Sequence, residues 1–220
     1  MRNLRRLLIT LVIIFGLFVV ADRVAVRVAE NEAASKIQSS QGLAQKPDVS
    51  IGGFPFLTQL IGSKLDQVKV QASDMKVKGS SVQLVSLNAT LSGVQISNNY
   101  SSAVADSATG TGYLTYSDLS KALPNNTTIG YGGAPGKVKV STTINGTKVS
   151  GTADISVVSG GSVQLNNLDT GDPLTSFLAN VFSPQIPLTG LPYGLQLQSI
   201  SADQDGVAVT VTGTDVHLNG

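Results

Sequence analysis

Cysteine and tryptophan are absent from this chain of 220 residues, and charged side chains are scarce. Without cysteine the protein can form neither disulfides nor thiolate metal sites. Charged residues make up 13% of the chain, whereas a soluble domain usually contains about a quarter. The formal net charge of +1 argues against a nucleic-acid-binding protein, because such proteins present a basic face.

The residues that are present favour a folded, β-rich protein. Hydrophobic residues account for 41% of the chain, and Gly, Ser, Thr, Val and Asn take the place of the missing charges. This composition is typical of strands joined by many turns, and it differs from that of a disordered chain. The length suits one domain of ordinary size plus an extension.

The N-terminus combines positive charge with an uninterrupted apolar run. Three arginines in MRNLRR precede the run from Leu7 to Ala21. As a helix of about 15 residues this run spans about 22 Å, which is short for a bilayer core of about 30 Å. Residues 1–21 are therefore either a cleaved signal peptide, with a weak site after Ala21, or an uncleaved signal anchor. In both cases the rest of the chain lies outside the cytoplasm, because the arginines stay inside.

Helical spacing continues beyond the apolar run. Neither proline nor glycine interrupts residues 22–41, and Gly42 is a typical stop signal at a helix C-terminus. We expect a long helix over about 22–41 that opens a single domain covering residues 22–220.

After residue 46 the hydrophobic period changes from that of a helix to that of a strand. Two alternating segments each change phase once, near Asp74 and between Leu84 and Leu87, which predicts a bulge or bend at each place. Asn145-Gly146 lies between two alternating runs and predicts a type I′ hairpin, and Asp205-Gly206 marks a second turn.

Three short helices are expected between the strands, within 56–65, 117–123 and 172–182. Asp172 is a suitable N-cap for the last of them, with Pro173 at its first position. The sequence thus predicts an α+β fold in which a long, curved antiparallel sheet wraps around the N-terminal helix. Such a sheet leaves an apolar groove, which is a natural site for an acyl chain.

Signatures of catalysis are weak. The one histidine, His217, lies four residues from the end, and no Gly-x-Ser-x-Gly motif occurs. Asp169-Thr170-Gly171 resembles the loop of an acidic protease, but a match of three residues has little weight. We expect no catalytic residue, no metal site and no cofactor.

Two segments carry a family resemblance: IGGFPFLTQLIGSKLDQVKVQA, from Ile51, and LTGLPYGLQLQSISADQDGVAVTVTGTDVHL, from Leu188. Together with the basic and apolar N-terminus they resemble the LmeA-type phospholipid-binding proteins of actinobacterial cell envelopes, from about residue 20 to the end. The resemblance implies an extracytoplasmic protein at the outer face of the cytoplasmic membrane, with phospholipid as its partner and a role in envelope biogenesis. It also implies kinship with elongated lipid-carrying folds.

The resemblance directs attention to the Phe-Pro-Phe-Leu and Leu-Pro-Tyr-Gly segments. Pro55 is expected to keep Phe54 extended at the mouth of the groove. The residues predicted to contact lipid are Phe54, Pro55, Phe56, Leu57, Leu60, Ile61, Leu191, Pro192 and Tyr193. The same residues also suit an alternative in which they close the ends of the sheet as core plugs.

Two other functions stay open at this point. One is a structural envelope protein that binds a protein partner, and the other is a hydrolase that acts on envelope components.

Overall fold

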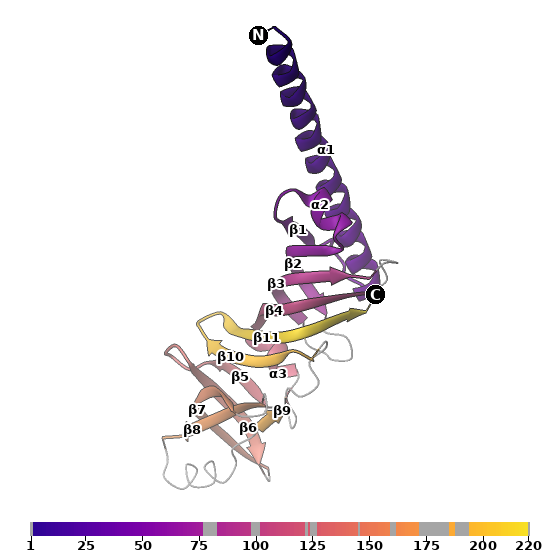
Figure 1. Ribbon diagram of the computed structural model, residues 1–220. Coiled ribbons are helices and arrows are strands. Elements are labelled where there is room, and N and C mark those ends of the chain that lie inside the picture. Colours follow the sequence, from indigo (N-terminus) through magenta and orange to yellow (C-terminus); the bar gives the residue numbers. More distant parts are fainter. Residues whose placement is uncertain are drawn as a thin grey trace.

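The computed structural model of the chain describes residues 2–76, 83–97, 102–121, 123, 127–144, 146–158, 162–171, 185–187 and 194–219. Figure 1 shows a long helix that runs into a domain built mainly of strands. This helix, α1 (Arg2–Gln41), has 40 residues and no break. The predicted α+β class, with an N-terminal helix and antiparallel strands, is confirmed.

The strands form two open sheets, rather than the single long sheet that the alternation suggested. The first sheet has the order β1 (Asp48–Gly52), β2 (Lys64–Lys76), β3 (Gln83–Ile96), β4 (Ser102–Thr115), β11 (Gly206–Asn219), β10 (Gln196–Ala202). The second has the order β5 (Thr128–Tyr131), β6 (Lys137–Ile144), β7 (Thr147–Val158), β8 (Ser162–Asp169), β9 (Gln185–Pro187). The second sheet is an insertion in the chain, because β10 and β11 return to pair beside β4.

Two short helices lie between the strands, as expected. They are α2 (Phe56–Ile61) and α3 (Tyr116–Lys121), and α3 follows β4 where the chain leaves the first sheet. The third predicted helix, within 172–182, lies outside the described residues.

Glycine ends α1 as its position in the sequence predicted. Gly42 adopts φ +64°, the left-handed conformation that glycine tolerates at the end of a helix. The N–H of Leu43 then donates to the carbonyl oxygen of Gln38 at 3.0 Å, and the Leu43 side chain is buried. This pairing between residues five apart is the Schellman motif, which satisfies a carbonyl that the helix leaves free.

The predicted turns and phase changes correspond to local features of the strands. The hairpin between β6 and β7 pairs Ile144 with Thr147, which leaves a loop of two residues as expected. The second phase change is a bulge, since β3 shifts register against β4 between Leu84 and Ser86. The first is a bend without a bulge: Asp74 has φ +52°, and the register of β2 against β3 is the same on both sides of it.

The first of two hydrophobic cores lies between α1, α2 and one face of the first sheet. Its buried members are Val26, Phe56, Leu65, Val94, Ala105, Ala108 and Val216. The helix thus packs against this face through the part of α1 that follows the apolar run. Burial of these side chains, at about 25 cal/mol for each Å² of apolar surface, holds α1 to the sheet.

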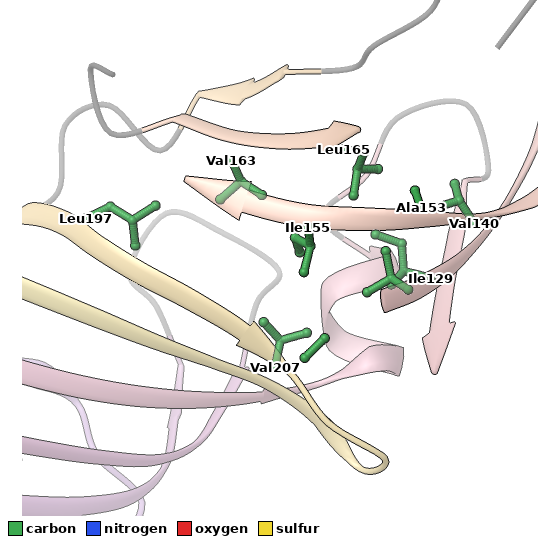
Figure 2. Packing of buried hydrophobic residues seen from close by; sticks show 10 residues of the cluster. Ile129, Val140, Ala153, Ile155, Val163, Leu165, Leu197 and Val207 are labelled. Carbon is green, nitrogen blue, oxygen red and sulfur yellow. The ribbon is translucent and has the colours of Figure 1, made fainter. Parts of the chain in front are cut away.

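The second core lies between the two sheets (Figure 2). Val163, Leu165 and Ile155 come from the second sheet, whereas Leu197 and Val207 come from the β10–β11 hairpin. One strand, β11, therefore contributes to both cores, through Val207 at its start and Val216 near its end. This strand couples the two halves of the domain.

A single carboxylate organises the turn between β10 and β11. The Oδ1 atom of Asp203 accepts hydrogen bonds from the N–H groups of Asp205 and Gly206, each at 3.0 Å. The same Oδ1 atom also accepts a hydrogen bond from the hydroxyl of Tyr113 on β4, at 2.7 Å. The hydroxyl of Tyr116 donates to the backbone carbonyl of Asp203 at 2.5 Å. The turn is thereby tied to β4 and to the start of α3.

These contacts perturb the acid–base behaviour of both partners. The hydrogen bond from Tyr113, with those from the N–H groups of Asp205 and Gly206, holds the pKa of Asp203 below its ordinary value of 3.8. Burial, together with the Asp203 carboxylate, raises the pKa of Tyr113 to about 12.

Acid is therefore expected to destabilise the turn at Asp203. Because the folded pKa of Asp203 is depressed, its contribution to stability is complete above pH 3.8 and is lost as the pH falls below that value. We expect the melting temperature of the unmodified full chain in detergent to fall more steeply below pH 4 than that of Asp203→Asn. The exposed Asp48→Asn variant serves as the control. Parallel melting curves for the chain and for Asp203→Asn would contradict the assignment.

Candidate functional site

The Phe-Pro-Phe segment lies at the end of the domain from which α1 projects (Figure 1). It forms the loop between β1 and α2 and the first turn of α2. Gly53 has φ +93°, and a Cβ atom there would clash with the side chains of Gln59 and Asp66. The side chain of Gln59 bridges the loop and β2. It donates to the Gly52 carbonyl at 3.3 Å and accepts a hydrogen bond from the Asp66 N–H at 2.8 Å. The backbone conformation at Gly53 thus favours glycine, and Gln59 links the loop to β2.

The two phenylalanines of the segment have opposite environments. The Phe54 side chain is 54% exposed, whereas that of Phe56 is 2% exposed and belongs to the core beneath α1. Pro55, between them, is extended with φ −77° and ψ 140° and precedes the first residue of α2. The ring before the proline therefore lies on the surface and the ring after it lies in the core.

The remaining predicted residues of this segment lie on α2. Leu57 and Leu60 are half-buried against the core, and Ile61 is 85% exposed. Six of the nine predicted residues thus lie in one continuous segment, the end of the β1–α2 loop and α2, which we call the shoulder and define as residues 54–61. Leu191, Pro192 and Tyr193 lie outside the described residues, so their proximity to the shoulder stays a prediction.

The N-terminus of α2 is capped by a side chain from α1. Pro55 offers no side-chain cap, and the Oδ1 atom of Asp22 instead accepts a hydrogen bond from the Leu57 N–H at 2.8 Å. Asp22 is completely buried, although it directly follows the apolar run. A carboxylate at a helix N-terminus is favourable because it satisfies free N–H groups and interacts with the helix dipole.

Arg23 balances the charge of this carboxylate and reaches the exposed phenylalanine. Its Nη2 and Nε atoms lie 2.5 Å and 3.2 Å from Asp22 Oδ2. Its guanidinium carbon lies 5.2 Å from the centre of the Phe54 ring, within the range of a cation–π interaction. The Arg23 side chain is 45% exposed. The aromatic ring of the shoulder and the cation of Arg23 on α1 therefore lie side by side.

Two further contacts fix α1 to the domain. The N–H of Ile51, on the edge strand β1, donates to Glu30 Oε1 at 2.8 Å. Lys46, in the segment that connects α1 to β1, donates to the side-chain oxygen of Asn31. Asp22 and, about two turns later, the adjacent Glu30 and Asn31 thus anchor the helix at two levels.

The sequence alone did not reveal the role of Asp22 as a cap of α2. One signal was present: a short helix that begins after proline, with no Ser, Thr, Asp or Asn before it, needs a capping group from elsewhere. The sequence alone does not say which acidic residue supplies it.

Two surface hollows lie along α1, and neither is lined by the predicted lipid-binding residues. A cleft of about 420 Å³ lies between α1 and the following segment, lined by Arg27, Glu30, Asn31, Ala34, Lys46, Pro47, Asp48 and Val49. The other follows the apolar run at Leu7, Thr10, Leu11 and Ile14. The first is charged, with both signs present, and the second is apolar.

The residues considered for catalysis are not assembled into a reactive group. His217 is exposed on β11, opposite Val104 in the ladder. Asp169 closes a turn by accepting a hydrogen bond from the Gly171 N–H at 2.9 Å. Within the described part of the chain, no group of three or more His, Cys, Asp or Glu residues is placed to hold a metal ion.

Comparison with known proteins identifies the class to which this arrangement belongs. Residues 20–212 match the family described as LmeA-like phospholipid-binding, so the chain belongs to that family. The match begins at the end of the apolar run and includes the shoulder. Membership supports phospholipid as the ligand. No curated protein and no solved structure matches the chain.

The cap of α2 gives a testable consequence. Asp22→Ala removes the acceptor of the Leu57 N–H and leaves Arg23 without its partner, so we expect α2 to open more often. Hydrogen exchange of the Leu57 amide in the full chain should accelerate several-fold. The matched control is Glu32→Gln, which changes an exposed acidic residue on the same helix. Equal exchange at Leu57 in the two variants would show that Asp22 is not the cap.

Proposed function

We propose that α1 holds this protein in the cytoplasmic membrane and that the domain binds phospholipid at the outer face for cell-envelope assembly. The observation that carries the proposal is the family match over residues 20–212, which supports phospholipid binding. Lipid is presented or moved, and no bond is made or broken.

The surface of α1 supports membrane insertion. By length and composition this helix can cross a membrane, and only 6% of its most apolar stretch of 18 residues is buried. Every residue from Arg2 to Leu17 is exposed. Contiguous apolar surface of this kind is unfavourable in water and suits a bilayer core.

The shoulder is the proposed entry point for lipid. It combines apolar side chains that the fold leaves accessible, above all Phe54 and Ile61, with the cation of Arg23. Acyl chains need the first and a lipid phosphate suits the second. Burial of each methylene group contributes about 0.8 kcal/mol, so a modest apolar site is enough to retain a long chain.

The two phenylalanines allow binding to be separated from folding. Phe56→Ala creates a cavity in the core, and truncation of a buried Phe costs about 3–5 kcal/mol of stability. Phe54→Ala removes an exposed ring and should leave the melting temperature nearly unchanged. We expect Phe54→Ala to reduce the phospholipid that co-purifies with the full chain, as measured by native mass spectrometry.

Tyr131→Ala, on β5, is the control for loss of an exposed aromatic ring elsewhere. If the unmodified chain carries no phospholipid, the proposed function is wrong. If folded Phe54→Ala carries as much as the control, the shoulder is not the binding site.

The anchor has its own test. Because α1 continues without a break from the apolar run into the domain, we expect the mature protein to retain residues 7–21 and to sediment with membranes. Fractionation of cells that express the full chain, followed by sequencing of the mature N-terminus, checks this. A soluble product that starts at Asp22 would exclude the anchor while leaving phospholipid binding intact.

A further inference from the structure

We infer that the shoulder rests on the outer leaflet of the same bilayer that α1 crosses, with Phe54 and Ile61 inserted among the lipid headgroups and upper acyl chains. The occupant of this surface is therefore the membrane itself. The inference rests on the proposed anchoring of α1, and it adds a second membrane contact that fixes the orientation of the domain.

The length of the apolar run brings the domain close to the bilayer. Leu7 to Ala21 spans about 22 Å as a helix, whereas a bilayer core is about 30 Å thick. A span that is too short is accommodated by thinning the bilayer or by drawing in flanking groups. The part of the domain next to Ala21 is therefore expected to lie close to the boundary of the hydrocarbon core.

The shoulder is what surrounds that end of the run. Exposure along α1 changes at Phe18 and Val19, which are half-buried, whereas the residues before them are exposed. The cover provided by the domain therefore begins inside the apolar run. At the next turn, the Leu57 N–H lies 2.8 Å from Asp22 Oδ1, which places the start of α2 at the level where the run ends. Figure 1 shows α2 beside α1 at this end of the domain.

The chemistry of the shoulder suits the lipid interface. Phe54 is 54% exposed and Ile61 is 85% exposed. On α1, the exposed apolar surface continues past the run through Val24 and Val28, one turn apart. These side chains continue the exposed apolar surface of α1 to the level of the domain, next to the exposed Arg23 and Arg27.

The charges of Asp22 and Arg23 do not oppose insertion, and the exposed carboxylate of Asp66, next to Gly53, belongs to β2. Asp22 is completely buried and its carboxylate is paired with Arg23, so it presents no charge to lipid. Arg23 is half-exposed, lies over the Phe54 ring, and has a long side chain that can keep its cation among lipid phosphates. A ring and a cation at one height are characteristic of membrane-interface anchors.

The absence of tryptophan from the chain makes the depth of single residues measurable. We would prepare Phe54→Trp, Ile61→Trp, Phe15→Trp and Tyr131→Trp in the full chain. Each would be reconstituted in phosphatidylcholine and phosphatidylglycerol vesicles, with and without bromine on the upper acyl chains. Phe15 lies within the apolar run and reports the anchor, and Tyr131 on β5 reports the distant sheet.

Interfacial side chains penetrate about 5–10 Å, so bromine should quench Trp at 54 and 61 at least about twofold and shift its emission to shorter wavelength. Trp at 131 should be quenched little. If Trp at position 15 is quenched but Trp at 54 and 61 is quenched as little as Trp at 131, the shoulder does not contact the membrane. The proposed function is not affected by that result. Trp at 15 unquenched would overturn the anchor and this inference together.

Circular dichroism and melting curves would establish that each variant is folded. Because the chain also lacks cysteine, Phe54→Cys and Ile61→Cys with a nitroxide label provide a second measurement of depth if a tryptophan perturbs the fold. Labels more accessible to oxygen than to a water-soluble relaxation agent support the contact, and the reverse contradicts it.

Discussion

The hydrogen bond between the buried carboxylate of Asp22 and the N-terminus of α2 connects the two physically different parts of this protein. On one side of it α1 is exposed and apolar, and on the other side α1 is packed against a sheet. Burial of a carboxylate is costly unless the charge is paired and its oxygens accept hydrogen bonds. Here Arg23 and the Leu57 N–H meet that requirement, and in doing so they set the position of the shoulder relative to the helix.

The strand β11 links the part of the domain packed against α1 to the second sheet. This strand places Val216 in the core under α1 and Val207 in the core between the sheets. β11 pairs along its length with β4. The turn at Asp203 also ties the start of β11 to β4, through the hydrogen bond from Tyr113. The second sheet is therefore held by the β10–β11 hairpin, so its packing is coupled to that of the core beneath α1.

Much of this fold was predictable because local signals act over short distances. The left-handed Gly42, the turn that brings Ile144 opposite Thr147 and the bulge after Leu84 each depend on signals within a few residues. The division into two sheets was not predictable, because alternation tells which face of a strand is buried and not which strand lies beside it. The Asp22 cap was missed for a related reason: its partner is 35 residues away in the chain. Of the predicted site, residues 54–61 lie together in one segment that ends in α2, and their contact with lipid stays a prediction.

The position of the shoulder also bears on the energetics of lipid uptake. A phospholipid that leaves a bilayer through water exposes its chains, at about 0.8 kcal/mol for each methylene, so an acyl chain of ordinary length faces a barrier of the order of 10 kcal/mol. A domain tied to its anchor at Asp22, with accessible apolar side chains at the same height, shortens that path. Under the proposed function, the rigid connection between helix and domain is then part of the mechanism, because a flexible linker would let the site drift away from the leaflet. If the domain takes up lipid as proposed, the continuous helix, the buried cap and the exposed ring of Phe54 together favour direct transfer between leaflet and protein over release into water.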